Sequence, residues 1–338
     1  MADTALVTGG SGFVAGHLIR LLIAEGWTVH TTVRSLAKEA AARSALKVDN
    51  SRLTFFAADL GGDDGWAEAA RGCTHVAHVA SPIPLAAPKH EDELIVPARD
   101  GALRVLRAAR DAGVKRVVMT SSGAAIQYGH GQTDRVFTEA DWTNVDGPHV
   151  SAYNKSKTIA ERAARDWIAA DGGDMEYVSI CPTAIMGPAM SDDFAPSIEI
   201  VKRMLGGEMP GVPNLGFGIV DVRDLAWLHW KALTQPGLAN ERFLASSRFY
   251  TMIEIARILR EQLGDQASKV PGRVLPDWLI RGVAIFKTEY RQFTSELGNI
   301  RKLDASHARD TLGWEATPVE RTLADTGQSL IDLGVVKR

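Results

Sequence analysis

A tyrosine and a lysine four residues apart, Tyr153 and Lys157, begin a segment with helical periodicity near the middle of the chain. Residues at this spacing share one face of a helix. The lysine charge favours the phenolate form of the tyrosine, so the tyrosine could donate a proton to a carbonyl oxygen or accept one from an alcohol. A lone Tyr-x-x-x-Lys pair occurs by chance in many helices, so the surrounding sequence must decide whether it indicates catalysis.

A serine about thirty residues earlier supports a catalytic role. Ser122 follows Thr120 and Ser121 at the end of a predicted strand over residues 116–120. Ligands of parallel sheets bind at the carboxyl edge, where the strands end. A serine hydroxyl there could hydrogen-bond the reacting oxygen and orient it. We therefore take Ser122, Tyr153 and Lys157 as the catalytic candidates.

A glycine-rich loop lies between the first predicted strand and the first predicted helix. Its sequence is Thr8-Gly9-Gly10-Ser11-Gly12-Phe13-Val14-Ala15-Gly16. Gly9 allows a tight turn, Gly12 lets the backbone approach a pyrophosphate, and the small Ala15 lets the helix pack on the strand. Free N–H groups at the helix N-terminus then face the anion. A plain turn at Gly9-Gly10 is the alternative, but the strand–loop–helix setting favours a dinucleotide site.

Charged residues after the second and third strands bear on which dinucleotide is bound. Arg34 ends the second strand, where NAD sites usually have an acid, and an arginine accommodates a 2′-phosphate. Lys38 could add a second positive charge. A solvated arginine is the alternative, but the preceding loop favours NADP(H). Asp59 could accept a hydrogen bond from the adenine amino group, or it could cap a helix.

The elements that must position these residues alternate between continuous apolar runs and segments of helical period. This alternation predicts an α/β fold with a doubly wound parallel (Rossmann) sheet and a smaller, mostly helical C-terminal substrate region. We expect strands at 5–7, 28–34, 53–58, 76–80, 116–120, 176–181 and, less regularly, 239–246, and helices at 14–25, 93–112, 152–170, 222–233, 252–263 and 318–333. We expect an NADP-binding domain over 1–181, joined by a returning segment at 219–246, and a substrate-binding region over 182–218 and 247–338.

With these motifs, the chain resembles the extended short-chain dehydrogenase/reductase family. It looks most similar to the dihydroflavonol reductase-like branch, which includes aldehyde, ketone and methylglyoxal reductases. The resemblance spans nearly the whole chain and includes the glycine loop, Val79 to Pro82, the segment from Pro97 to Leu106, Thr120 to Ser122, Tyr153 to Lys157, Pro182 to Pro188, Asp221 to Asp224 and Leu312 to Trp314. Gly123-Ala124 after Ser122 departs from the Thr-Asp-Glu pattern of sugar-nucleotide dehydratases and argues against dehydration.

The resemblance implies roles for individual residues. It implies Ser122, Tyr153 and Lys157 as a triad, with Lys157 also holding the nicotinamide ribose hydroxyls. The residues expected along the cofactor are Thr8, Gly9, Ser11, Gly12, Phe13, Val14, Arg34, Lys38, Asp59, Leu60, Val79, Ala80, Ser81, Thr120, Tyr153, Lys157, Pro182 and Ile185. The residues expected near the substrate are Ser81, Gln127, Met186 and Phe194.

Composition sets limits on the partners. The chain has 338 residues, 45% hydrophobic and 23% charged, and a formal net charge of -3. Such a balance gives no general attraction to nucleic acid or anionic membrane, and no run of apolar residues predicts a membrane span. The acidic N-terminus does not resemble a signal peptide, and two cysteines are too few for a disulfide framework, so we expect a cytoplasmic protein.

Other conspicuous residues are given structural roles. His75 and His78 point to opposite faces of a strand, so we expect no metal site. Cys181 is expected to be a packing residue. The C-terminal tryptophans Trp227, Trp230, Trp278 and Trp314 are expected in the core; the alternative, for one or two of them, is a position facing an apolar substrate.

The sequence therefore predicts an NADPH-dependent carbonyl reductase, acting on a ketone or aldehyde as a monomer or homodimer. A sugar-nucleotide epimerase of the same fold is one alternative, but it would hold NAD tightly, and Arg34 argues against it. A non-catalytic NADP-sensing protein is the other, but it would usually lack the tyrosine or the lysine.

Overall fold

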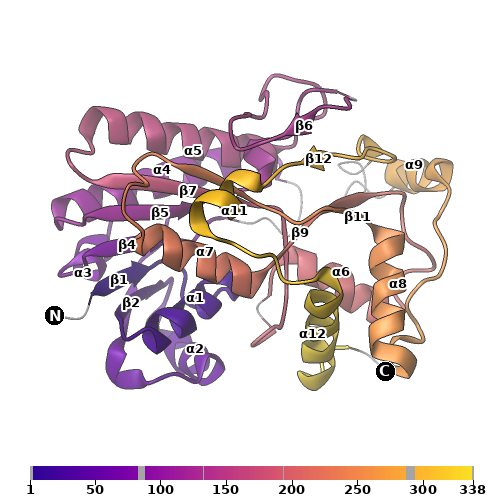
Figure 1. Ribbon diagram of the computed structural model, residues 1–338, viewed down its shortest axis with the longest axis horizontal. Helices are drawn as coiled ribbons and strands as arrows, with labels where there is room; N and C mark the ends of the chain where they lie inside the picture. Colours follow the sequence, from indigo (N-terminus) through magenta and orange to yellow (C-terminus); the bar gives the residue numbers. More distant parts are fainter. Residues whose placement is uncertain (1–2, 83–87, 132, 193, 287–293, 337–338) are drawn as a thin grey trace.

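Seven parallel strands form the central sheet of the computed structural model, which describes residues 3–82, 88–131, 133–192, 194–286 and 294–336. Their order across the sheet is β3-β2-β1-β4-β5-β7-β10, so the chain winds outward in both directions from β1 and β4 (Figure 1). This is the doubly wound α/β arrangement that the alternating pattern predicts. The strands are β1 Thr4–Val7, β2 Thr28–Val33, β3 Leu53–Ala57, β4 His75–His78, β5 Arg116–Thr120, β7 Glu176–Pro182 and β10 Arg242–Ala245.

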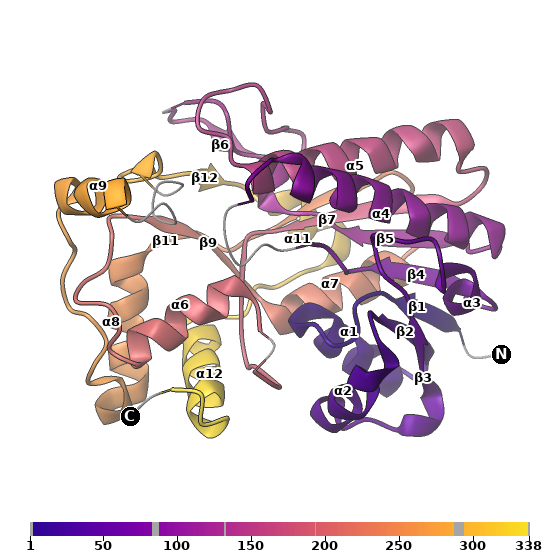
Figure 2. The ribbon, with the colours of Figure 1, turned by 180° about the vertical axis from the view of Figure 1, so that it is seen from behind.

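Helices cover both faces of this sheet, which is why most residues of its strands are buried. On one face, Leu18 of α1 and Leu228 of α7 share a core with Val7 of β1. On the other face, Leu6 packs in a separate core with Leu106 of α4. Figures 1 and 2 show α4 and α5 on one side of the sheet and α1 and α7 on the other. The helices of these layers are α1 Phe13–Ala24, α2 Glu39–Leu46 and α7 Val222–Thr234 on the first face, and α3 Trp66–Ala70, α4 Asp92–Asp111 and α5 Ala152–Asp171 on the second.

The C-terminal part contains a second, smaller sheet that the sequence analysis did not predict. Its strands lie in the order β11-β9-β8, and its core is shared with α6, α8 and α12. A capping box between Thr251 and Glu254 begins α8. The elements are β8 Ala184–Met186, β9 Gly216–Asp221, β11 Phe249–Thr251, α6 Pro196–Leu205, α8 Met252–Leu263, α9 Asp277–Phe286, α11 Ser306–Leu312 and α12 Val319–Asp332, with a two-stranded pair of β6 Val136–Phe137 and β12 Lys302–Leu303.

Most of the predicted elements lie within one or two residues of their expected positions. The irregular stretch at 239–246 does contain a strand, β10, which joins the edge of the main sheet beside β7. The returning segment brings α7 and β10 to the main sheet, whereas β9 pairs with β8 and β11 in the smaller one. The prediction that Trp278 is buried is wrong: it is 73% exposed on α9, whereas Trp314 is 3% exposed.

The residues that the structure describes contain neither a helix that could span a membrane nor a cluster of metal-binding side chains. No helix in them is long and apolar enough to cross a membrane. They also contain no group of three or more His, Cys, Asp or Glu side chains arranged to hold a metal ion.

Candidate active site

The glycine loop joins β1 to α1 in a compact turn. Gly9 has a φ of +77°, which favours glycine, and a Cβ there would lie 3.1 Å from the Cβ of Ala80. The Gly12 N–H donates to the Gly9 carbonyl over 2.8 Å, and a Cβ on Gly12 would lie 3.2 Å from that same oxygen. Gly12 is the N-cap of α1 and provides no side-chain cap, and the first turn has no acidic residue. The N–H groups of this helix end are therefore available to an anion.

A buried hydrogen-bond cluster fixes the ends of β1 and β4 to each other. The Thr8 hydroxyl accepts hydrogen bonds from the N–H groups of Val79 and Ala80 over 3.0 and 2.9 Å. Its own proton is therefore directed to Nδ1 of His78, 3.0 Å away. Burial, and then the Lys157 charge, lower the pKa of His78 to about 3, so this imidazole is neutral. The cluster sets where the chain from Val79 to Ser81 leaves the sheet.

The tyrosine and lysine of α5 lie beside this strand end. The Lys157 ammonium donates to the Ser81 hydroxyl over 2.8 Å, and its nitrogen lies 5.8 Å from the centroid of the Tyr153 ring. Lys157 is 5% exposed, whereas Tyr153 is half-buried. The helix begins just before them because the Ser151 side chain accepts a hydrogen bond from the Asn154 N–H. In the described part of the chain Ser81 is the one hydrogen-bond partner of the Lys157 ammonium, which leaves its other N–H groups for a ligand.

Ser122 follows β5 and is the N-cap of a short 3₁₀ turn, Gly123–Ala125. Its hydroxyl oxygen accepts a hydrogen bond from the Ala124 N–H over 3.1 Å, which leaves its proton for another acceptor. The residues before it alternate between the faces of the sheet. Thr120 Oγ1 lies 2.7 Å from His229 of α7, and Ser121 donates to Glu161 of α5.

The charged residues expected near the adenosine end lie at the surface. Arg34 and Lys38 are exposed, and neither forms an ion pair with any residue that the structure describes. Asp59 is also exposed and accepts a hydrogen bond from the Gly61 N–H in a turn. The alternative interpretation of Asp59 as a helix N-cap is wrong, because Gly65 occupies that position before α3.

The other expected residues lie in varied surroundings. Leu60 lies against Gly101 of α4, and Pro182 ends β7 opposite Ala245. The remaining expected residues differ in burial. Four are half-buried (Ser11, Val14, Ile185 and Phe194), and three are buried (Phe13, Met186 and Gln127). Met186 is fully buried in the core of the smaller sheet, whereas the side-chain oxygen of Gln127 is buried without a hydrogen-bond partner in the described ranges.

Two buried polar groups lie next to the site although the sequence analysis predicted no role there for either. His78 is bonded to Thr8, and Glu161, one helical turn beyond Lys157, is bonded to Ser121 and Arg242. A glutamate on the same helix face as the candidate pair Tyr153 and Lys157 was the one available signal for the second group. Cys181, expected to be a packing residue, is fully buried, and burial raises the pKa of its thiol to about 12, so it stays protonated.

The residues present fit a phosphate-bearing dinucleotide. At the helix end behind Gly12, free N–H groups face outward and no side chain on Gly12 obstructs the approach of an anion to them. Arg34 provides, at the end of β2, an exposed cation that forms no ion pair within the described ranges. Both lie at the carboxyl edge of the sheet, the edge at which β4, β5 and α5 bring Ser81, Ser122 and Lys157.

This fold and this edge define a Rossmann-type α/β protein. The family model described as "NAD dependent epimerase/dehydratase family" matches residues 5–244, and the chain belongs to that family. It is 33% identical to dihydroflavonol 4-reductase of Zea mays over 280 residues, covering 80% of this chain and 77% of the relative. It is 30% identical to an anthocyanidin reductase of Vitis vinifera over 309 residues, covering 84% and 90%. A structure of Gre2 in complex with NADPH from Candida albicans superposes with a TM-score of 0.82 at 26% identity, covering 98% of this chain and 99% of that one.

Proposed function

We propose that the protein is an NADPH-dependent carbonyl reductase that converts a ketone or aldehyde to an alcohol. The observation that carries this proposal is the hydrogen bond from Lys157 to Ser81, with Tyr153 beside the same ammonium. It joins the helix of the proton-donor candidate to the strand end that faces the glycine loop. The names of the plant relatives, both reductases, and the NADPH of the Candida albicans complex support the same conclusion.

The proposed reaction requires one hydride and one proton. When bound, NADPH supplies a hydride from its nicotinamide C4 to the carbonyl carbon. The Tyr153 hydroxyl donates its proton to the carbonyl oxygen, on which negative charge develops. The Ser122 hydroxyl donates a hydrogen bond to the same oxygen and orients it. The Lys157 ammonium stabilises the phenolate that Tyr153 becomes, and the products are the alcohol and NADP⁺.

Other residues are assigned to binding. The free N–H groups behind Gly12 hold the pyrophosphate, and Arg34 with Lys38 holds the 2′-phosphate. The N–H groups of Lys157 that Ser81 leaves free hold the nicotinamide ribose. The Gln127 side-chain oxygen, which has no hydrogen-bond partner among the described residues, is available to a polar group of the substrate. We further propose that residues 1–181 and the returning segment 219–246 hold the cofactor, and that 182–218 and 247–338 shape the substrate side.

Isotope transfer tests this function. The purified protein is incubated with NADPH dideuterated at the nicotinamide C4 and a panel of aryl ketones, diketones, aldehydes and flavonoid-type ketones. The expected product is an alcohol with one deuterium on its carbinol carbon and one NADP⁺ formed per alcohol. Tight NADPH binding without turnover on any of these would indicate a sensor instead. NAD that co-purifies and is not consumed would indicate an epimerase.

A further inference from the structure

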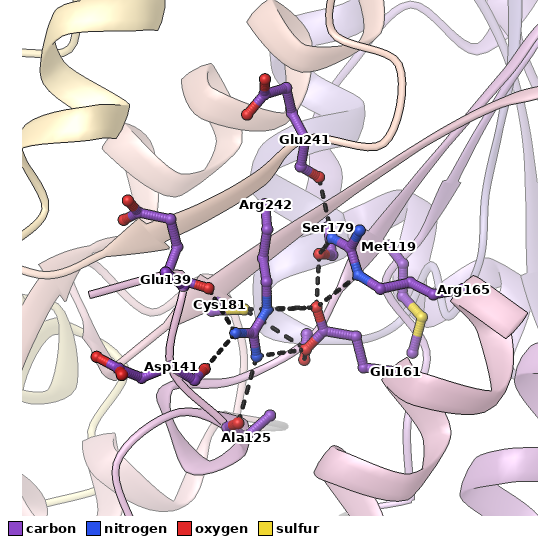
Figure 3. A network of polar contacts seen from close by, with 12 residues as sticks. Met119, Ala125, Glu139, Asp141, Glu161, Arg165, Ser179, Cys181, Glu241 and Arg242 are labelled. Atoms are coloured by element: carbon purple, nitrogen blue, oxygen red, sulfur yellow. Dashed lines mark hydrogen bonds and ion pairs between the residues drawn. The ribbon is translucent and has the colours of Figure 1, made fainter. Parts of the chain in front are cut away.

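The carboxylate of Glu161 lies at the centre of a buried polar network between α5 and the sheet (Figure 3). Its Oε2 accepts a hydrogen bond from the Ser121 hydroxyl over 2.6 Å, and its Oε1 accepts one from the Ser179 hydroxyl, also over 2.6 Å. Arg242 Nε donates to Oε1 over 2.7 Å, and Arg242 Nη2 donates to Oε2 over 3.1 Å. The carboxylate therefore links helix α5 to the end of β5, the middle of β7 and the start of β10.

Arg242 is itself held in place from several directions. Its Nη1 donates to the carbonyl oxygens of Glu139 and Asp141, and its Nη2 lies 3.3 Å from the carbonyl oxygen of Ala125. The guanidinium also stacks over the Trp142 ring, 3.8 Å from the ring centroid. The arginine thus holds the carboxylate against the segment that follows Ser122.

The charge state of Glu161 fits this role. Burial raises the pKa of Glu161, but the charge of Arg242 and the hydrogen bonds from Arg242, Ser121 and Ser179 outweigh burial and hold it below its usual value. A buried ion pair gives little net stability, because removing two charges from water offsets most of their attraction. Its benefit is therefore expected in the arrangement that it imposes rather than in the free energy of unfolding.

We propose that Ser121 and Glu161 are positioning residues that set Ser122 relative to Tyr153 and Lys157. Ser121 directly precedes Ser122 on the chain, and Glu161 follows Lys157 by one helical turn and Tyr153 by two. Their hydrogen bond is a direct link between the strand end and the helix that carry the two groups acting on one substrate oxygen. This proposal depends on the catalytic roles proposed above for Ser122 and Tyr153.

The hydrogen bond between Ser121 and Glu161 is expected to affect kcat because of where it lies. Two donors that share one oxygen must both lie within hydrogen-bond distance of it, and an error of about 1 Å can cost about 100-fold in rate. Ser179 bonds the same carboxylate over the same distance, but it lies in the middle of β7 and adjoins no proposed catalytic residue. Loss of its hydroxyl also removes the acceptor of a hydrogen bond from Arg165 Nη2. It leaves Glu161 held by Arg242, by Ser121 and by Arg165, whose Nε lies 3.5 Å from Oε1.

Two matched substitutions test the proposal, Ser121→Ala and Ser179→Ala. Each removes one buried hydroxyl from Glu161; Ser121 is 2% exposed and Ser179 is 0% exposed. We expect similar decreases in Tm for the two variants and NADPH Kd values within about twofold of the wild type. We expect kcat to fall about tenfold or more in Ser121→Ala alone, and Ser121→Thr, which keeps the hydroxyl, to recover most of it.

The outcomes distinguish failure of the positioning role from failure of the proposed function. Equal kcat losses in Ser121→Ala and Ser179→Ala, or no loss in either, would overturn the positioning role, as would a Ser121→Ala defect confined to KM or to NADPH binding. Full turnover by Tyr153→Phe would instead overturn the proposed function itself. If Tyr153→Phe is inactive and the two serine variants behave alike, the function stands and the positioning role does not.

Discussion

Replacement of Arg34 tests the choice of cofactor directly. Its side chain is exposed and forms no ion pair in the described ranges, so its removal breaks no ion pair within them. In Arg34→Ala the interaction proposed to be lost is a charge-assisted hydrogen bond to the 2′-phosphate, reduced by solvent screening. We estimate about 1–2 kcal/mol for it, which corresponds to about a five- to thirty-fold lower kcat/KM for NADPH. NADH carries no 2′-phosphate, so its kcat/KM should be unchanged.

Steady-state rates with both cofactors, measured at low and at high salt, check this expectation. The NADPH defect should shrink at about 1 M salt, where an exposed ion pair is screened over a few ångströms. Arg34→Asp should add repulsion and enlarge the defect, and Lys47→Ala, an exposed lysine beyond α2, should have no effect. Equal losses for NADPH and NADH in Arg34→Ala would refute the 2′-phosphate assignment, and so would a defect insensitive to salt.

Two further predictions concern the glycine loop and the buried histidine. Gly12→Ala should raise the NADPH Kd more than tenfold while its Tm stays within a few degrees of the wild type. Gly62→Ala, where a Cβ meets nothing within 4 Å, should change neither the Kd nor the Tm. Calorimetric titration and thermal melts check this, and unchanged NADPH binding by Gly12→Ala would contradict the phosphate role. Burial lowers the pKa of His78 in the folded protein to about 3. Between about pH 6.5 and pH 3 the unfolded chain therefore binds a proton at His78 and the folded chain does not. The contribution of neutral His78 to stability is complete above pH 6.5 and is lost as the pH falls. In urea unfolding at pH 7, 5.5 and 4, the free energy of unfolding should therefore fall less steeply with pH in His78→Asn than in the wild type, by up to about 1.4 kcal/mol per pH unit. An identical pH dependence of the two proteins would contradict a neutral His78.

The main sheet was predictable because its order is local and repetitive. Most of its strands are short runs rich in apolar or β-branched residues, and the helices repeat their apolar residues at helical spacing. The strands β1 to β5 and the helices α4 and α5 can therefore be recognised from neighbouring residues alone. The smaller sheet was missed because β8 and β11 are three residues long and β9 begins among glycines and prolines. Such strands form through pairing partners far along the chain rather than through their own pattern.

The same distinction holds at the site. Tyr153 and Lys157 can be paired from sequence because helix geometry fixes their relation. The contacts around them cannot, since Thr8 bonds His78 across 70 residues and Glu161 bonds Arg242 across 81. Trp278 shows the converse error, because a large apolar residue was assigned to the core although nothing in the local sequence indicates which face of α9 is covered.

The proton-donor role of Tyr153 is the central claim, and the Tyr153→Phe variant tests it most directly. Phenylalanine keeps the ring beside Lys157 and removes only the hydroxyl. Ketone-dependent NADPH oxidation and NADPH binding are measured on the same preparation. The account predicts that oxidation falls by at least about 100-fold, the usual contribution of a positioned acid, while the NADPH Kd changes by less than about twofold. Turnover close to that of the wild type, with binding intact, would contradict it.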